Sequence, residues 1–283
     1  MNRVELPPRA EWDETIARAL AEDLGTAGDI TSLAVVPAPA RARAVLVARR
    51  AGTIAGLRLV PHVFGRLDRA VEIELAADDG DAVEAGTRLA ELAGPARPLL
   101  AGERTALNLL GRLSGIATAT RELVDLVAGT RARIFDTRKT TPTLRSLEKY
   151  AVRCGGGTNH RFGLHDAMLI KDNHVVVAGT VAAALRRARE AARPNTLVEV
   201  EIARLDQLEE AIAGGADVVM LDNFDLDAMR EAVRRTAGRV PLEASGGVRR
   251  ETVRAIAECG VDRISVGWIT HSAPALDVAL DFD

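Results

Sequence analysis

Apolar and polar positions alternate in short runs through the first third of the chain. Between about residues 42 and 92, segments such as residues 71–75 alternate as β-strands do, and polar turns such as residues 78–81 separate them. Helical periodicity is expected before this stretch, over residues 13–21, and after it, over residues 103–127. These positions predict an N-terminal unit of short strands and helices.

After residue 131 the pattern becomes a regular alternation of strands and helices. Short apolar runs recur about every 20 to 25 residues, and helical patterns lie between the later ones. The predicted strands are residues 133–135, 167–170, 197–202, 218–221, 240–244 and 263–266. Strands that each lead into a helix pair in parallel through right-handed crossovers. Six such units predict an α/β barrel, with an open doubly wound sheet as the competing architecture.

Residues suited to chemistry follow each predicted strand. They are Asp136, Thr137, Arg138 and Lys139 after the first, Lys171 to His174 after the second, Glu201 at the third, Asp222 at the fourth, Ser245 to Gly247 after the fifth and Gly267 after the sixth. The carboxyl ends of parallel barrel strands converge on one mouth, where barrel enzymes have their active sites. We therefore expect these side chains to line a single site.

The charges indicate an anionic small molecule rather than nucleic acid. The formal net charge is −3, whereas nucleic-acid-binding proteins are usually basic overall. Positive charge is concentrated between residues 136 and 174, which also hold three of the five histidines. Arginine binds carboxylates and phosphates through two parallel hydrogen bonds. A pocket built from this segment would bind a substrate with several negative charges.

Lysine is rare enough in this chain to be informative. Only Lys139, Lys149 and Lys171 are lysines among 37 basic residues. A lysine ammonium is a compact point charge that the wide arginine fork does not replace. We expect Lys139 and Lys171 to be functional and Lys149 to lie on the surface. Of the histidines, His160 is either functional or structural, and His165 is expected to be structural.

Two further groups leave alternatives open. The segment from Ser245 to Gly247 precedes a predicted helix and would bind a phosphate through backbone N–H groups, or else form a tight turn. Glu201 and Asp222 would face ribose hydroxyls or a magnesium ion, because both are hard-oxygen chemistry. Ion pairs with Lys139 or Lys171 are the structural alternative.

The chain shows the features expected of a cytoplasmic protein. Cys154 and Cys259 have no metal-ligand spacing, so buried free thiols are expected. The first ten residues lack the apolar core of a signal peptide, and no apolar run approaches the ~20 residues of a membrane-spanning helix.

The longest motifs resemble those of one known family. The chain resembles quinolinate phosphoribosyltransferase at residues 136–142, 147–152, 155–161 and 169–174, with shorter matches at residues 22–31, 103–108, 221–223, 243–247 and 270–272. The resemblance implies transfer of the phosphoribosyl group of phosphoribosyl pyrophosphate to quinolinate with decarboxylation. The products would be nicotinate mononucleotide, CO2 and pyrophosphate, in the de novo biosynthesis of NAD.

The same resemblance implies an architecture. Family members have an N-terminal α/β sandwich domain, here expected as residues 1–112, and an incomplete, seven-stranded α/β barrel, here residues 113–283, with a helix over residues 103–127 as the connection. They form homodimers with shared active sites, and Arg104 would reach into the site of the partner. Quinolinate and phosphoribosyl pyrophosphate are the implied partners, with no nucleic acid and no membrane.

Each candidate residue takes a role by this resemblance. Arg138, Arg161 and Lys171 would bind the quinolinate carboxylates beside Thr137, Lys139 and His160, Glu201 and Asp222 would meet the ribose and its Mg²⁺, and Ser245, Gly246, Gly247, Gly267 and Trp268 would lie at the 5-phosphate. Lys139, Lys171, Glu201 and Asp222 form the implied catalytic set. Trp268 replaces the small residue usual in the family, and would narrow the phosphate site or turn outward.

Three other functions fit parts of the pattern. A related branch associated with molybdenum transport shares the fold, but retention of Arg138, Lys139, Arg161 and Lys171 favours the quinolinate enzyme. A Schiff-base aldolase would use Lys171 as its nucleophile, and a pocket rich in arginine fits this less well. A non-catalytic binding module would leave the strand-end residues without a chemical role.

Overall fold

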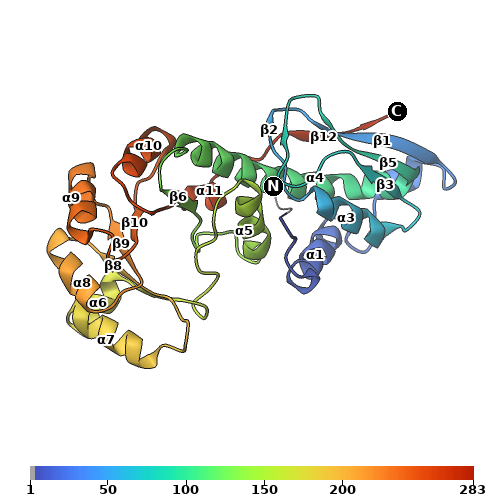
Figure 1. Ribbon diagram of the computed structural model, residues 1–283. Helices are drawn as coiled ribbons and strands as arrows, with labels where there is room; N and C mark the ends of the chain where they lie inside the picture. The colour runs from blue at the N-terminus through green and yellow to red at the C-terminus, as the bar shows by residue number, and fades with distance from the viewer. Residues whose placement is uncertain (1–3) are drawn as a thin grey trace. The chain divides into compact units, whose positions relative to one another are not determined.

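The computed structural model describes residues 4–283, which form two compact units (Figure 1). The first unit contains the residues up to Arg121 together with Thr140–Gly156 and Trp268–Asp283, and the second contains Glu122–Lys139 and Gly157–Gly267. Helix α4 (Ala96–Leu126) contributes to both units, and the expected boundary between residues 112 and 113 falls inside it. A division into two domains at that position stays a prediction.

An antiparallel sheet is the framework of the first unit. Its strands run in the order β12 (Val278–Phe282), β1 (Arg41–Ala48), β5 (Arg88–Pro95) and β3 (Glu72–Leu75), and β2 (Gly52–Thr53) pairs separately with β4 (Ala82–Val83). The helices of this unit besides α4 are α1 (Asp13–Leu24), α2 (Ile30–Val35), α3 (Val60–Leu67), α5 (Arg145–Cys154) and α11 (Trp268–His271), with 3₁₀ turns η1 (Arg9–Glu11) and η2 (Leu57–Leu59).

The C-terminal strand completes this N-terminal sheet. Leu46 in the centre of β1 pairs with Leu280 of β12 on one side and with Ala90 of β5 on the other. Side chains of a strand point alternately to the two faces of a sheet, and in β1 the later residues alternate between buried and half-buried. The N-terminal unit is therefore closed by residues from the far end of the chain, which the sequence pattern did not predict.

Helix α5 brings one correction to the sequence analysis. Lys149, expected at the surface, is only 3% exposed. Every residue from Leu147 to Val152 is buried, so neighbours cover the helix over most of its circumference. One of these contacts is the hydroxyl of Tyr150, which donates a hydrogen bond to the Asp79 carboxylate at 2.7 Å. The expectation was wrong because the rarity of lysine says nothing about which helix faces are covered.

A parallel sheet is the framework of the second unit. Its order is β6 (Arg133–Phe135), β11 (Arg263–Ser265), β10 (Leu242–Ser245), β9 (Val218–Asp222), β8 (Val198–Ile202) and β7 (Met168–Ile170). The connecting helices are α6 (Asp172–Ala178), α7 (Val181–Ala191), α8 (Leu208–Ala213), α9 (Leu226–Thr236) and α10 (Arg250–Glu258), with the 3₁₀ turn η3 (Leu205–Gln207) before α8. The six strands derived from the sequence are confirmed, whereas the described residues place six strands in this sheet rather than seven.

The strands of this sheet are short and buried. In β8 and β9 nearly every residue is inaccessible, as expected of a parallel sheet that helices cover. Two of the helices begin at polar caps: the Thr180 hydroxyl accepts from the Ala183 backbone N–H at 3.0 Å before α7, and the Asp225 carboxylate accepts from Ala228 N–H at 2.8 Å before α9. The Asp225 cap fixes where α9 starts, and hence the length of the loop after β9.

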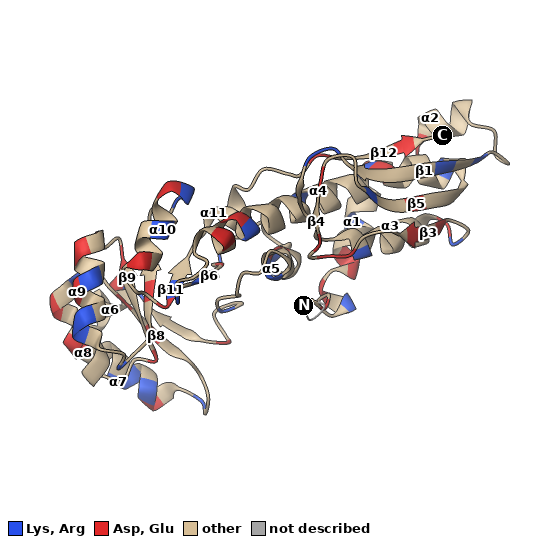
Figure 2. Ribbon diagram, turned by 45° about the horizontal axis from the view of Figure 1, so that its top comes forward, with Lys and Arg blue, Asp and Glu red and all other residues tan. Residues whose placement is uncertain are grey.

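The surface of the second unit mixes both signs of charge. Figure 2 shows basic and acidic residues interleaved along α9. Glu231 of α9, for example, pairs with both Arg234 and Arg235. This distribution does not form the basic stripe of a nucleic-acid-binding surface.

Two remaining expectations concern the cysteines and the membrane. Cys154 and Cys259 are free and buried, as the sequence predicted. Across the helices of residues 4–283, none combines the length and apolar character that crossing a bilayer requires.

Candidate active site

A cavity of about 630 Å³ lies at the carboxyl ends of the parallel strands, within the size range of small-molecule sites. Its lining comes entirely from the second unit: Thr137, Arg138, Lys139, His160, Arg161, Leu169, Lys171, Glu201, Met220, Asp222, Asn223, Ser245, Gly246, Gly247 and Ser265. Eleven of the 14 residues singled out from the sequence are among them. Strand-end convergence therefore brings the expected residues into one cavity, and their individual roles stay predictions.

Three expected residues lie elsewhere. Arg104, in α4, and Trp268, at the start of α11, belong to the first unit. Gly267 follows β11 at the end of the second unit and is not among the cavity residues.

Four cavity residues were given no site role from the sequence: Leu169, Met220, Asn223 and Ser265. A signal for two of them was present, because residues two apart on a strand share a face. Leu169 precedes Lys171 by two positions, and Met220 precedes Asp222 by two. Both apolar side chains supply a wall suited to a flat aromatic ring.

The carboxylate of Asp136 fixes the loop that carries His160 and Arg161. Asp136 follows β6 and is fully buried. It accepts a hydrogen bond from the His160 backbone N–H at 2.8 Å and another from the Asn159 side-chain amide at 2.6 Å. Phe135 also forms a parallel bridge with Thr158. These bonds place the residues that follow the glycine run against the strand ends.

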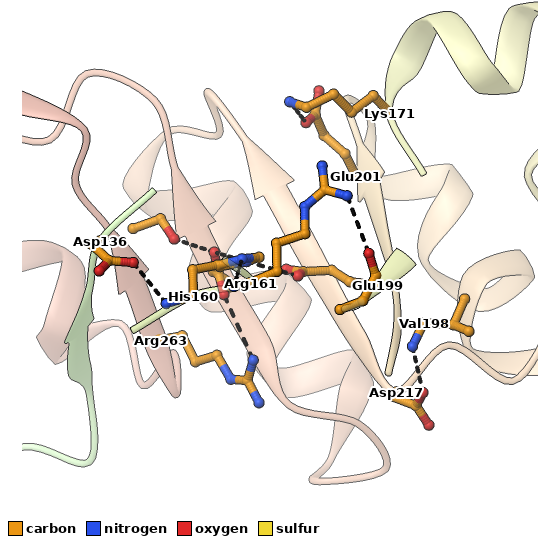
Figure 3. Close-up of polar contacts among 12 residues, drawn as sticks. Asp136, His160, Arg161, Lys171, Val198, Glu199, Glu201, Asp217 and Arg263 are labelled. Atoms are coloured by element: carbon orange, nitrogen blue, oxygen red, sulfur yellow. Dashed lines mark hydrogen bonds and ion pairs between the residues drawn. The ribbon is translucent and has the colours of Figure 1, made fainter. Parts of the chain in front are cut away.

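Hydrogen bonds define the protonation of the His160 ring (Figure 3). The backbone N–H of Arg161 donates to Nδ1 of His160 at 2.8 Å, so Nδ1 carries no proton. The other ring nitrogen, Nε2, lies 2.9 Å from Oε2 of Glu199 and 3.5 Å from Oε1 of Glu243. In this geometry Nε2 carries the proton that faces the two carboxylates.

The carboxylates around His160 favour a second proton on its ring. Burial lowers its pKa, but the hydrogen bonds and charges of Glu199 and Glu243 outweigh burial and raise the pKa to about 9. A second proton on the ring would have to displace the Arg161 N–H from Nδ1. Burial, together with the neighbouring Glu243, also raises the pKa of Glu199.

This buried cluster has the distances of a metal site but not its protonation. One ligand atom from each of His160, Glu199 and Glu243 lies within 4.8 Å of the others. A histidine nitrogen must be unprotonated to bind a metal, and here the Arg161 N–H already occupies Nδ1. The Ser265 hydroxyl donates to Glu243, and Nη1 of Arg263 lies 4.0 Å from its other oxygen. Protein groups thus balance the negative charge of Glu243, as a bound metal ion would.

Two arginines make one side of the cavity electropositive. Nη1 of Arg161 donates to the Ala167 carbonyl at 3.2 Å. Burial and the neighbouring Arg138 charge lower the pKa of Arg161, while Glu199 opposes this shift. Two guanidinium groups whose positive charges repel each other attract an anion that is placed between them. Arg138 and Arg161 therefore mark the anion-binding side.

Lys171 and Glu201 lie at the ends of neighbouring strands and form an ion pair. Nζ of Lys171 lies 3.0 Å from Oε2 of Glu201, which is the structural alternative considered for these residues. The Lys171 side chain is about half exposed, so solvent weakens this pair. The backbone N–H of Lys171 donates to Nδ1 of His174, which fixes the start of α6. An ammonium in an ion pair is not the uncharged amine that a Schiff-base nucleophile requires.

Another part of the cavity lining combines Asp222 with a glycine turn. The Asn223 side-chain amide donates to Oδ2 of Asp222 at 2.8 Å, and its backbone N–H donates to the Ser245 carbonyl at 2.9 Å. Gly246 has φ +94°, and a Cβ there would lie 2.1 Å from Oδ1 of Asn223. Gly247 has φ +61° with open space around it. The turn thus needs glycine, and it presents open backbone before α10.

The balance of charge in the lining favours a polyanion. Four cationic residues, Arg138, Lys139, Arg161 and Lys171, face two acidic ones, Glu201 and Asp222. Without His160, these six residues give the lining a net charge of +2. Such a pocket can hold carboxylates and phosphates, and its two carboxylates can meet hydroxyl groups or a divalent cation.

Family models match this chain in two consecutive parts. Residues 29–114 match the model of the quinolinate phosphoribosyl transferase N-terminal domain, and residues 116–281 match that of the C-terminal domain. The junction lies within α4, near the boundary expected from the sequence.

Individual relatives agree with the family models. The chain is 48% identical to a probable nicotinate-nucleotide pyrophosphorylase (carboxylating) of Bacillus subtilis, over 92% of this chain and 89% of the relative. It is 46% identical to the nicotinate-nucleotide pyrophosphorylase (carboxylating) of Mycobacterium leprae, over 95% and 96% of the two chains. The solved nicotinate-nucleotide pyrophosphorylase of Francisella tularensis superposes with a TM-score of 0.95 at 41% identity, over 100% of both chains.

Proposed function

Because the chain belongs to the quinolinate phosphoribosyltransferase family, it converts quinolinate and phosphoribosyl pyrophosphate to nicotinate mononucleotide, CO2 and pyrophosphate, and we propose that the strand-end cavity of the second unit is the active site. The observation that carries this proposal is the composition of the cavity lining. Four cationic side chains, the carboxylates of Glu201 and Asp222 and the Gly246–Gly247 turn line one cavity.

The cationic residues of the cavity would bind quinolinate. Arg138, Arg161 and Lys171 would pair with the two carboxylates, with Thr137, Lys139 and His160 beside them. Arginine forks favour planar carboxylates, and the walls made by Leu169 and Met220 favour a flat ring. His160 would contribute through its fixed place rather than as an acid, because both ring nitrogens already have protein partners.

The acidic residues would hold the ribose and Mg²⁺. Glu201 shares Oε2 with Lys171, and Asp222 shares Oδ2 with Asn223, so each keeps a second oxygen for a hard cation or a hydroxyl. These donors fit Mg²⁺, which when bound would neutralise the leaving pyrophosphate.

The glycine turn would receive the 5-phosphate. Ser245, Gly246 and Gly247 precede α10, where backbone N–H groups and the helix dipole favour an anion. Gly267, after the last strand, and Trp268 would complete this end, by analogy with barrels that bind phosphate after their final strands.

The proposed mechanism rests on position and charge. As pyrophosphate leaves, positive charge develops at the anomeric carbon, and Glu201 and Asp222 would stabilise it. The pyridine nitrogen, held by the carboxylate contacts, forms the new bond to that carbon. The ring nitrogen is then cationic, so the electron pair left when the adjacent carboxylate departs as CO2 is stabilised, and a proton replaces the CO2. Lys139 and Lys171 complete the catalytic set by holding the anionic groups.

We also propose the finer architecture and a homodimer. Six parallel strands with β6 and β7 at the two edges support an incomplete barrel, and the antiparallel sheet with its helices supports an α/β sandwich. Exposed apolar residues support self-association: Ile30 and Val35 of α2 are 68% and 70% exposed, and Val176 and Val177 of α6 are 78% and 88% exposed. In such a dimer Arg104 would enter the site of the partner.

Product formation by the purified protein tests this function. Nicotinate mononucleotide and CO2 are measured together with phosphoribosyl pyrophosphate, Mg²⁺ and quinolinate, with nicotinate as the control substrate. We expect both products from quinolinate and none from nicotinate, since the second carboxylate must be bound. A folded protein that yields neither product would contradict the proposal.

A further inference from the structure

Two glutamates lie buried beneath the cavity where no solvent reaches them. Glu199 of β8 and Glu243 of β10 are both 0% exposed, and β9 lies between their strands. Removing a carboxylate from water is costly unless other groups compensate its charge. Their partners therefore indicate what each carboxylate does.

The two carboxylates differ in their nearest partners. Glu243 accepts from the Ser265 hydroxyl, lies near the Arg263 guanidinium, and is 3.5 Å from Nε2 of His160. Glu199 lies closer to His160 (Figure 3), with 2.9 Å between Nε2 and its Oε2, and its charge acts on the Arg161 guanidinium. Glu199 is thus linked to the residues that would contact a substrate.

Arg161 needs such a counter-charge. It lies within the electrostatic influence of Arg138, which opposes its charge, and its Nη1 donates to the Ala167 carbonyl at 3.2 Å. Long arginine side chains have several rotamers, and ordering them costs conformational entropy. A carboxylate behind the guanidinium opposes the repulsion from Arg138 and fixes the fork, so that its other N–H groups remain directed toward the cavity.

Backbone bonds restrict this arrangement further. The Arg161 N–H donates to Nδ1 of His160, and the His160 N–H donates to Asp136. The His160 ring thus joins Glu199 to the backbone of Arg161. Glu199 consequently holds Arg161 by two routes, one through the guanidinium and one through the imidazole.

We propose that Glu199 is a positioning residue for substrate recognition, which holds Arg161 and His160 so that Arg161 binds one of the two substrate carboxylates at a fixed place. This inference rests on the proposed function, in which the cavity binds quinolinate. It assigns Glu199 no contact with the substrate. Its consequence is specificity: a fixed fork distinguishes a ring with two carboxylates from a ring with one.

The test compares Glu199→Gln with the unaltered enzyme. Glutamine has the shape of glutamate but no charge, so it can still accept from His160 but cannot supply the counter-charge to Arg161. We expect the KM for quinolinate to rise about ten- to hundredfold, the usual effect of losing a group that orients a ligand-binding side chain. The KM for phosphoribosyl pyrophosphate should change less than about twofold and kcat less than about threefold, because the proposal leaves the transition state intact.

Monocarboxylates separate recognition from general damage. Pyridine-2-carboxylate and pyridine-3-carboxylate each have one of the two quinolinate carboxylates, and the inhibition constant of each against quinolinate is measured. Glu199→Gln should weaken only the one whose carboxylate pairs with Arg161. Glu209→Gln is the matched control, because Glu209 pairs with Arg239 at the surface of the same unit. It should change none of these constants.

Two further variants keep the test decisive. If Glu199→Gln does not fold, Glu199→Asp takes its place. Aspartate retains the carboxylate one methylene further away, and we expect it to raise the quinolinate KM by a smaller factor. In an Arg161→Lys background, Glu199→Gln should have no further effect on quinolinate, because the fork it orients is absent. Equal losses for quinolinate and phosphoribosyl pyrophosphate, or an unchanged quinolinate KM in a folded Glu199 variant, would overturn the proposal. Failure of the unaltered enzyme to turn over quinolinate would instead contradict the proposed function.

Discussion

Replacing Gly246 with alanine should damage both stability and the phosphate end of the site. The backbone there has φ +94°, where an L-residue other than glycine costs about 1–2 kcal/mol. The new Cβ would also lie 2.1 Å from Oδ1 and 2.6 Å from Cγ of Asn223, so the Asn223 side chain must move. Moving it breaks its 2.8 Å hydrogen bond to Asp222, which costs about 1 kcal/mol, and a strained rotamer adds a similar amount.

Together these terms lower the free energy of unfolding by about 3–4 kcal/mol for Gly246→Ala. An alanine substitution at a positive-φ glycine without the steric contact should lower it by only about 1–2 kcal/mol. Gly238 is that control, because it has φ +77° and no atom within 4 Å of a new Cβ. Chemical denaturation of both variants measures the difference, which we expect to be about 2 kcal/mol.

The same pair of variants should differ in kinetics. Gly246→Ala shifts Asn223 and Asp222, so the KM for phosphoribosyl pyrophosphate should rise about tenfold, which corresponds to about 1.4 kcal/mol of lost binding. Gly238→Ala lies in the turn after α9 and should leave this constant unchanged. Equal losses of stability in the two variants, with an unchanged KM in both, would refute the steric reasoning.

Four other changes have expected outcomes. Thr143→Gly should raise the free energy of unfolding by about 0.5–1 kcal/mol, because Thr143 is β-branched at φ +68°, and a lower melting temperature would contradict this. Glu148→Gln should cost about 2–3 kcal/mol, since buried Glu148 holds Arg112 at 2.8 Å and the Thr141 N–H at 3.0 Å. The control Glu231→Gln, at a partly exposed ion pair, should leave the melting temperature nearly unchanged. In a Cys259→Ala background, iodoacetamide at pH 8 should modify Cys154 only after unfolding, because burial raises its pKa to about 12, and rapid labelling of the folded protein would disprove this. Chelation of divalent ions should abolish turnover, and added Mg²⁺ should restore it while the melting temperature stays nearly constant.

The order of strands and helices in the second unit could be predicted from the sequence because the patterns that indicate them are local. Each strand is a short apolar run and each helix has its own periodicity, so their order could be read along the chain. Because the strand ends converge, the sequence predicted that Arg138, Lys171 and Asp222 would line the same cavity.

Burial of the glutamates could not be predicted in this way. The segment from Val198 to Ile202 alternates apolar and acidic residues, which is typical of a strand with one face in water. In the structure that acidic face points inward, so Glu199 is buried beneath the cavity and Glu201 lines it. Alternation shows which residues share a face, but not what covers that face.

Pairing between distant segments was hidden for a related reason. The strand at Val278–Phe282 pairs with β1, more than 200 residues earlier, and no local pattern specifies that partner. Lys149 is a second case, since its burial depends on segments that pack around α5.

The most direct test of the central claim is a crystal structure of the protein with quinolinate bound. We expect the two carboxylates at Arg138, Arg161 and Lys171, with the ring nitrogen directed toward Glu201 and Asp222, so that the anomeric carbon can be reached from the side of Gly246 and Gly247. Quinolinate bound outside the strand-end cavity, or within it with both carboxylates turned away from the arginines, would contradict the account.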